Sequence, residues 1–250
     1  VGLRKLLEGC DLLTRPIESF HVGFVIGPRL NACGRLSHAS PALKLLTDAT
    51  EAEADELAEQ LDALNVERRS IGHDIFEQAC AKVTERFGEH LPPVLVLSDD
   101  AWHPGVVGII ASRLVEQFGR PTLLLCRDNG RLRGSGRSVP GVNLVEALRA
   151  CADDLLGFGG HAMAVGLSVD PERVEAFEQS LARAMAGYAD LLGRKRVVQV
   201  ASVVRCGELS LALLDELSML EPYGSDNDRP LLMLRGVQVR IGGQRMGRGG

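Results

Sequence analysis

The segment from Glu51 to Phe87 constrains the fold of this chain most, because it contains no proline and only one glycine, Gly72. Its apolar residues recur at the spacing of one helical face: Leu57, Leu61, Leu64, Ile71, Ile75 and Val83. One helix over the whole segment would be about 55 Å long, too long for the interior of a compact domain of this size. Arg68 and Gln78 interrupt the apolar face, so we expect a connector between two domains rather than a coiled coil.

Alternating strands and helices follow this segment. The predicted strands cover residues 94–97, 122–126 and 164–169, and the predicted helices cover 106–118, 143–156 and 171–192. Asn129-Gly130 tolerates positive φ angles and predicts a hairpin into a further strand, Arg131–Ser138. This alternation is typical of an α/β domain, which we place at residues 92–192.

The flanking segments have a simpler pattern. Before the long helix we expect a helix over Val1–Cys10, a strand over His21–Ile26 and a helix starting at Ser40-Pro41 with Ser40 as its cap. After residue 192 we expect a strand over Val197–Val204, a helix over Ser210–Leu220 and a strand over Leu231–Ile241. The chain begins at Val1 without methionine and ends in glycines, so we expect a piece of a longer protein.

Composition limits the class of protein. The six cysteines are scattered without a Cys-x-x-Cys pair, which argues against a zinc site or a disulfide framework and indicates a reducing cytoplasm. No run approaches the roughly 18 consecutive apolar residues of a membrane span. The net charge of −5 excludes a uniformly basic nucleic-acid binder, although arginines cluster in Arg127–Arg137.

That cluster contains the strongest candidate for anion binding, the segment RLRGSGRS at Arg131–Ser138. Its glycines let the backbone approach a ligand, Ser135 and Ser138 offer hydroxyl groups, and the Arg137 guanidinium matches the geometry of a phosphate. The alternative is an exposed hairpin with solvated arginines.

A second candidate is the segment GPRLNACGRL, in which Arg29 and Arg35 flank Asn31. The alternative here is a loop arginine paired with a carboxylate. A third candidate is the junction that contains His103 and Gly105, where free N–H groups at the start of a helix favour an anion. Here the alternative is a histidine that only caps the helix, beside a core tryptophan, Trp102.

The last candidate is the turn that contains Gly159, Gly160 and His161, because glycine has no Cβ to hold a ligand away from the backbone. The alternative is a histidine whose hydrogen bonds are satisfied within the turn.

The acidic pairs Asp99-Asp100 and Asp153-Asp154 have no histidine at ligand spacing, so we expect no metal ligands in this chain. The sequence therefore predicts a half-site that recognises phosphate without the metal chemistry.

Four motifs in this order resemble the C-terminal part of the RecJ family, in the DHH phosphoesterase superfamily, whose DHHA1 domain carries the Gly-Gly-His motif. They read GPRLNACGRL, WHPGVVGIIASRL, GSGRSVPGVNL and FGGHAMAVGL. The resemblance implies an α/β chain in four parts. These are the end of a catalytic DHH domain (1–50), a connector helix (51–91), a DHHA1 domain (92–192) and the truncated start of an OB-fold β domain (193–250).

The resemblance also implies an activity, a single-strand-specific 5′→3′ DNA exonuclease of DNA repair and recombination that requires Mn²⁺ or Mg²⁺. The metal ligands would lie upstream of Val1, so this fragment alone would be inactive. Ser135 and Arg137, with Arg29 or Arg35, would hold the 5′ phosphate. His161 and its glycines would lie against the DNA backbone, with His161 a backbone contact or transition-state donor rather than a metal ligand.

The implied partners are single-stranded DNA with a 5′ phosphate, a single-strand-binding protein and a helicase, for a cytoplasmic monomer that does not contact a membrane. Two other classes remain open. One is a non-catalytic nucleic-acid-binding relative, which the upstream sequence would decide. The other is a DHH-type phosphoesterase for short oligonucleotides or cyclic dinucleotides, against which a strand-tracking OB fold argues.

Overall fold

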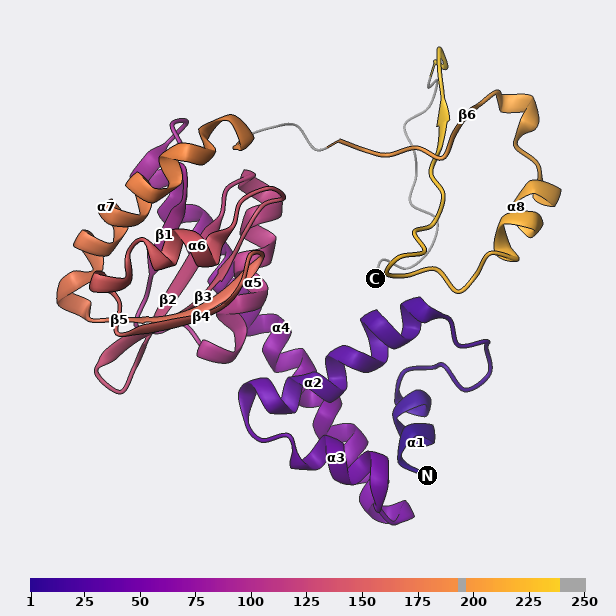
Figure 1. Cartoon of the computed structure of the whole chain (residues 1–250). Helices are drawn as coiled ribbons and strands as arrows, with labels where there is room; N and C mark the ends of the chain where they lie inside the picture. The colour runs from indigo at the N-terminus through magenta and orange to yellow at the C-terminus, as the bar shows by residue number, and fades with distance from the viewer. Residues whose placement is uncertain (193–196, 239–250) are drawn as a thin grey trace. The chain divides into compact units, whose positions relative to one another are not determined.

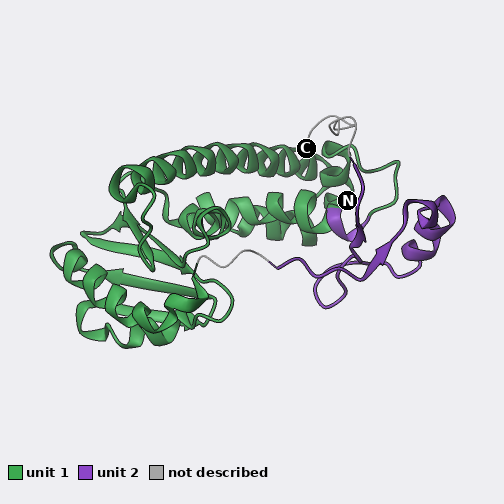
Figure 2. Cartoon of the chain, turned by 90° about the horizontal axis from the view of Figure 1, so that it is seen from above, with its two compact units in different colours: residues 1–17, 21–195 green, residues 18–20, 196–250 purple. Residues whose placement is uncertain are grey.

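The computed structural model describes residues 1–192 and 197–238. The chain divides into two compact units, residues 1–17 with 21–195 and residues 18–20 with 196–250 (Figure 2). Each unit is considered by itself below. Within the described part of the chain, no helix is both long enough and apolar enough to cross a lipid bilayer.

Helix α4 (Glu51–Phe87) dominates the first unit and confirms the long helix predicted over the same residues (Figures 1 and 2). Thr50 starts it with a reciprocal cap, in which the Glu53 carboxylate accepts a hydrogen bond from the Thr50 N–H at 2.9 Å. Buried residues recur every three or four positions except between Asn65 and Gly72: Ala54, Ala58, Leu61, Asn65, Gly72, Ile75, Ala79 and Val83. One place in this series, between Asn65 and Gly72, is occupied by Arg68.

The first half of α4 packs against three short helices, α1 (Gly2–Gly9), α2 (Gly27–Leu36) and α3 (Ser40–Thr47). Their shared core includes Leu6, Ile26, Cys33, Leu45 and Leu61. This all-helical part holds α2 against α4, and α2 carries the GPRLNACGRL motif.

The prediction of a strand at residues 21–26 is wrong, because His21–Ile26 form a π-helix, η1, that continues into α2. A lone strand here would leave its backbone groups unpaired, whereas a helical backbone satisfies its own and still buries Ile26. Residues 27–36 are helical rather than a loop, with Pro28 in the first turn. Ser40 lies in the first turn of α3 but is not its cap, since its hydroxyl pairs with His38 Nδ1 at 2.7 Å.

A mixed five-stranded sheet forms the other part of this unit, in the order β1-β2-β3-β5-β4 (Figure 1). The strands are β1 (Leu95–Ser98), β2 (Thr122–Asp128), β3 (Arg131–Arg137), β4 (Gly157–His161) and β5 (Ala164–Val169). Strands β1 and β2 are parallel and all other neighbours are antiparallel. The predicted hairpin is confirmed, with Asn129 and Gly130 at φ +50° and +80° between β2 and β3.

Helices cover both faces of this sheet. On one face, α6 (Leu144–Arg149) and α7 (Val174–Met185) bury Leu123, Leu125, Val165 and Phe177. On the other face, α5 (Pro104–Phe118) and the second half of α4 bury Leu95, Leu97, Leu124 and Ile110. The outer strands β5 and β4 lie beyond α5 on this second face, and the register places the candidate residues of β3 and β4 there.

Three predicted elements differ from the structure. The helix predicted over 143–156 ends at Arg149 and is followed by a short 3-10 helix, η2 (Ala152–Asp154). The helix predicted over 171–192 is α7 between two 3-10 segments, η3 (Pro171–Arg173) and η4 (Ala186–Leu191). The Gly-Gly-His segment is not a turn but the end of strand β4, because pairing with β5 satisfies its backbone.

The second unit contains a two-stranded parallel sheet of β6 (Ser202–Val204) and β7 (Leu232–Leu234), with η5 (Cys206–Glu208) and α8 (Leu211–Ser218) between them. Ser210 caps α8 through a hydrogen bond from the Leu213 N–H at 3.1 Å, near the predicted helix start. Both strands are shorter than predicted, since each finds only the other as a partner in the described residues. Residues 239–241 of the last predicted strand, and the glycine-rich end, lie outside the described residues.

Candidate functional site

Strand β3 divides its residues between the two faces of the sheet. Arg133, Ser135 and Arg137 face the side of α5, since Ser135 pairs with the buried Leu124 of that face. Gly134 and Gly136 face the other side, where an added Cβ would collide with Leu125 or Val165. The alternation of RLRGSGR therefore places polar groups on one face, and the buried Leu132 with two glycines on the other.

Ser135 and Arg137 both pack against Gly108 of α5. A Cβ added to Gly108 would lie 3.1 Å from Arg137 Nη2 and 3.3 Å from Ser135 Oγ. The sequence analysis did not identify Gly108 as a site residue, although it lies in one of the quoted motifs. The lack of a side chain at this position lets the serine and arginine lie side by side under the helix.

The two arginines of α2 have different surroundings. Arg29 Nε donates to Asp62 Oδ1 at 2.8 Å, and its Nη1 donates to the Val25 carbonyl at 2.9 Å. Arg35 Nη1 instead donates to the Gly105 carbonyl at 3.2 Å, at the start of α5. The structure thus neutralises Arg29 and brings Arg35 to the junction of α2 and α5. Asn31 lies exposed on α2.

The segment before α5 is held by its own hydrogen bonds. His103 Nδ1 accepts a hydrogen bond from the Gly105 N–H at 3.1 Å and so caps the helix. A neutral His103 ring therefore carries its proton on Nε2. Trp102 is buried and its indole donates to Gln78 at 2.8 Å. His103 therefore caps the helix and Trp102 lies in the core, while Nε2 of His103 remains as a donor.

Gly105 is a point of close approach between two helices. A Cβ on Gly105 would overlap the carbonyl oxygen of Arg35. The absence of that side chain allows the end of α2 to reach the start of α5, where Arg35 donates to the Gly105 carbonyl. Burial lowers the pKa of the Arg137 guanidinium, and the positive charge of Arg35 lowers it further.

Arg68 of α4 lies near the same junction. Its Nη2 donates to the buried Asn65 Oδ1 at 2.8 Å, while its Nε is buried without a hydrogen-bond partner in the described structure. Burial lowers the pKa of the Arg68 guanidinium, and the charges of Arg35 and Arg69 lower it further. The interruption of the apolar stripe at Arg68 was visible in the sequence, but we interpreted it only as evidence for a connector.

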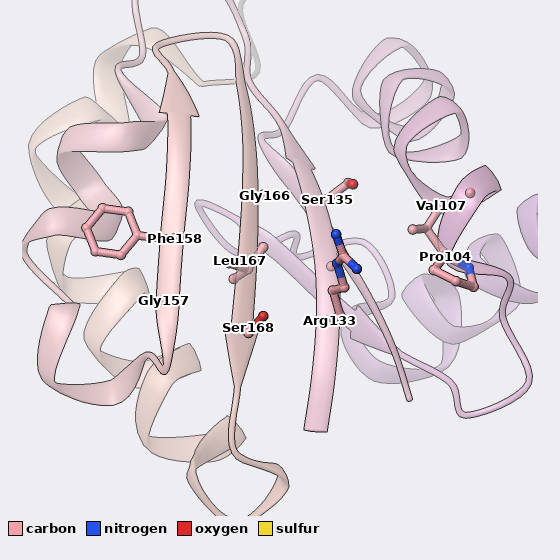
Figure 3. Close-up of a pocket in the computed structure, with 11 residues that line it drawn as sticks. Pro104, Val107, Arg133, Ser135, Gly157, Phe158, Gly166, Leu167 and Ser168 are labelled. Carbon is pink, nitrogen blue, oxygen red and sulfur yellow. The ribbon is translucent and has the colours of Figure 1, made fainter. Parts of the chain in front are cut away.

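A cavity of about 510 Å³ opens between the start of α5 and the β3–β5–β4 part of the sheet (Figure 3). Arg133 and Ser135 line its side toward α5, and glycines of β4 and β5 line the other side. A Cβ added to Gly157 or Gly159 would meet no atom within 4 Å, and one on Gly166 would meet only a carbonyl oxygen at 4.0 Å. At these glycines the backbone of the sheet is exposed, with no side chain covering it.

His161 ends β4, and the register Arg137–Ala164–His161 puts it in the same transverse row as Arg137. Its Nδ1 lies 3.2 Å from the Ala164 nitrogen and 3.1 Å from the Ala164 oxygen. Nδ1 can accept from the Ala164 N–H or, when it carries the proton, donate to the Ala164 carbonyl, so the hairpin holds this nitrogen in either tautomer. The ring is exposed, and Nε2 takes part in neither contact. The neighbouring Gly160 has φ +135°, and a Cβ there would overlap Ala164 O.

Ser138 does not lie with Ser135. Its side chain is buried, and its hydroxyl donates to the Val142 carbonyl at 2.8 Å. Ser138 therefore holds the loop between β3 and α6 rather than facing the cavity.

In the part of the chain that the structure describes, no group of three or more histidine, cysteine or acidic side chains could hold a metal ion. The acidic pairs have other contacts. Asp99 pairs with Lys82 at 3.2 Å and Asp100 with Arg127 at 2.7 Å. Asp154 accepts hydrogen bonds from Ser180 and Arg173, which lower the pKa of its carboxyl group. The described residues do not suit a divalent metal site.

Comparison with known proteins gives a consistent result. Residues 91–187 match the model of the DHHA1 domain. The chain is 35% identical to the single-stranded-DNA-specific exonuclease RecJ of Salmonella typhimurium, over 98% of this chain and 44% of that protein. It is 36% identical to the RecJ of Bacillus subtilis, over 94% of this chain and 30% of that protein.

A solved structure gives the same relation. The crystal structure of RecJ in complex with Mn²⁺ from Thermus thermophilus superposes with a TM-score of 0.81 and 34% sequence identity, over 93% of this chain and 34% of that one. A structure of the same protein with Mg²⁺ gives a TM-score of 0.80. The chain thus spans less than half the length of the relatives it matches.

Proposed function

This chain is a homologue of the RecJ exonucleases that contains a DHHA1 domain, and from that premise we propose that it is part of a single-strand-specific 5′→3′ DNA exonuclease. The longer protein hydrolyses phosphodiester bonds in DNA repair and recombination. Residues 1–50 are the end of its DHH catalytic domain, 51–91 its connector helix, 92–192 its DHHA1 domain and 193–250 the start of an OB-fold domain. Its partners are single-stranded DNA, a single-strand-binding protein and a helicase in the cytoplasm.

The role of this chain is to hold the 5′ end of the strand. Arg35 from α2 and Ser135 and Arg137 from β3 bind the terminal phosphate beside the start of α5. The observation that carries this proposal is their convergence through Gly105 and Gly108, which lack the side chains that would separate them. Guanidinium groups without a carboxylate partner are suited to bidentate phosphate binding.

The DNA backbone then follows the open face of β4. Gly159 lets a phosphodiester approach the sheet, and the Nε2 side of His161 donates to a phosphate oxygen or to the charge that develops in the transition state. His103 Nε2 is a further donor at the 5′ end, and Asn31 borders it from α2. Gly105, Gly160 and Ser138 contribute by holding the backbone in place, as their contacts support.

The metal ions of this exonuclease are Mn²⁺ or Mg²⁺, held by residues upstream of Val1. RecJ structures with both ions support the choice of these two metals. When bound, the metal activates water and stabilises charge on the phosphate. The chain described here positions the substrate and is inactive alone.

The phosphate pocket is tested by Arg137→Ala in the full-length protein. We expect the ratio of kcat/KM on 5′-phosphorylated to 5′-hydroxyl strands to fall about tenfold or more, because a charge-assisted bidentate contact to phosphate is lost. Arg131→Ala, at the exposed far end of the same strand, is the matched control and leaves the ratio unchanged. An equal loss on both substrates for Arg137→Ala would contradict the pocket.

A further inference from the structure

The cavity beside the start of α5 extends beyond the residues that the proposed function uses. Its volume of about 510 Å³ is typical of a site that encloses an organic ligand rather than a single phosphate group. Ser135 belongs both to the cavity lining and to the proposed phosphate pocket, so the two sites are continuous. Arg133, Ser168 and Gly166 also line the cavity, and the proposed function gives them no role. The cavity therefore has room for a part of the ligand that adjoins the phosphate.

The register of the sheet places that room along β3. The pair Ser135–Gly166 is followed, two residues along β3, by the row Arg133–Ser168–Gly157. Residues two apart on a strand share a face and are separated by about 7 Å. Arg133 and Ser168 thus lie on the face of Ser135, one step farther from Arg137. One sugar separates a terminal phosphate from its base over a comparable distance.

Bare backbone lies between these side chains. A Cβ on Gly157 would meet no atom within 4 Å, and one on Gly166 would meet only a carbonyl oxygen at 4.0 Å. Phe158 contributes only backbone to the cavity, because its ring packs into the core on the opposite face and points away in Figure 3. Pro104 and Val107 of α5 supply apolar surface to the same cavity. A planar ring can therefore lie against the sheet.

Arg133 differs from the arginines of the phosphate pocket in its charge environment. Its Nη1 lies 3.6 Å from the Asp128 carboxylate. By contrast, across the described residues no carboxylate lies within 4.0 Å of a side-chain nitrogen of Arg35 or Arg137. A partly neutralised guanidinium group is a weaker phosphate ligand, but its N–H groups and flat face still suit a nucleobase. The Arg133 side chain is 67% exposed, so a ligand in the cavity can reach it.

We propose that this cavity is a subsite for the nucleobase of the 5′-terminal nucleotide. The proposal rests on the proposed function and extends it from the terminal phosphate to the base of the same nucleotide. The base lies on the backbone of β5 and β4, and Arg133 and Ser168 form hydrogen bonds to its edge. Every base has acceptors for a guanidinium group, and a hydroxyl group both donates and accepts. The subsite therefore recognises the presence of a base rather than its identity.

The experiment uses this 250-residue chain and three short thymidine oligonucleotides labelled at the 3′ end. The first has a 5′ phosphate, the second has a 5′ phosphate on an abasic tetrahydrofuran residue, and the third has a 5′ hydroxyl. Fluorescence anisotropy gives the three Kd values. The second Kd divided by the first is the base ratio, and the third divided by the first is the phosphate ratio. We expect a wild-type base ratio of about ten, the usual size of the contribution of one stacked base.

Two substitutions change the subsite without touching the phosphate-binding arginines. Arg133→Gln removes the guanidinium group and should lower the base ratio to about three or less. Gly166→Val fills the open space over the sheet, so it should melt near the wild-type temperature and lower the base ratio to about one. Arg131→Gln, at an exposed position two residues from Arg133 on the same face, is the matched control and should keep both ratios.

The two ratios separate the subsite from the phosphate pocket. A wild-type base ratio near one with a clear phosphate ratio would overturn the subsite and leave the phosphate pocket in place. A base ratio that persists in folded Arg133→Gln and Gly166→Val variants would also overturn it, since the base would then bind elsewhere. A phosphate ratio near one with a base ratio near ten would overturn the proposed phosphate capture and support the subsite.

Discussion

The two faces of the β4–β5 hairpin differ in what they contact. Toward α6 and α7, Val165, Leu167 and Val169 of β5 are at most 4% exposed. The residues between them, Gly166 and Ser168, line the cavity together with Gly157 of β4. One face of the hairpin is core, and the other is backbone left open beside a row of polar groups (Figure 3).

The glycines of the hairpin follow the same division. Gly160 lies in a backbone conformation with φ +135° and directly against Ala164, so the fold itself requires glycine there. Gly159 has open space where a side chain would be, so the fold does not require glycine at that position. The glycines on the open face thus leave space beside the backbone that the fold itself does not use.

The largest expected effect is the difference in the free energy of unfolding between substitutions at Gly160 and at Gly159. Gly160→Ala should lower the free energy of unfolding by about 2–3 kcal/mol, because the new Cβ meets the Ala164 backbone and the φ angle is strained. Gly159→Ala should change it by less than about 1 kcal/mol, and can stabilise the strand, since alanine loses less backbone entropy than glycine. Urea denaturation of both variants measures this. Equal losses would remove the distinction between the two glycines.

A smaller effect concerns binding on the open face. Gly159→Val should leave the melting temperature unchanged and weaken single-stranded DNA binding by about tenfold, since the branched side chain fills the space beside the backbone. Met163→Ala, at the exposed turn of the same hairpin, is the control and should bind like the wild type. Wild-type affinity in a folded Gly159→Val variant would show that DNA does not approach this strand.

The smallest effect concerns the anchor of the hairpin, Asp154, which accepts from Ser180 at 2.6 Å and Arg173 at 2.5 Å just before β4. These contacts lower the pKa of its carboxyl group below the ordinary 3.8. A lowered folded-state pKa gives stability that is present above pH 3.8 and is lost as the pH falls below it. Asp154→Asn should therefore be less stable than the wild type near neutral pH, and the difference should shrink in acid.

Urea denaturation of both proteins at several pH values measures this difference. Asp153→Asn, at the exposed neighbouring position, is the control. A difference between wild type and Asp154→Asn that grows in acid would contradict the assignment.

Local signals predicted much of the fold. The uninterrupted segment 51–87 predicted α4, and Asn129-Gly130 predicted the β2–β3 hairpin, since propensity and turn chemistry act over a few residues. The same reasoning failed at 21–26, where an apolar, β-branched run became helical inside a helical core. It also missed that the Gly-Gly-His segment is a strand, because glycine has little strand propensity and only the pairing with β5 makes it extended.

The sequence by itself determined which residue types could bind phosphate and identified the segments that hold them. It left open whether Arg29 or Arg35 belongs with Ser135 and Arg137, since both lie in one motif. The tertiary structure gives them different partners, because Asp62 on α4 pairs with Arg29 while Arg35 donates to the Gly105 carbonyl at the start of α5, and we therefore propose Arg35 for the phosphate pocket. The buried Nε of Arg68 is a second example, because its lack of a hydrogen-bond partner depends on which helices surround it and cannot be predicted from a local pattern.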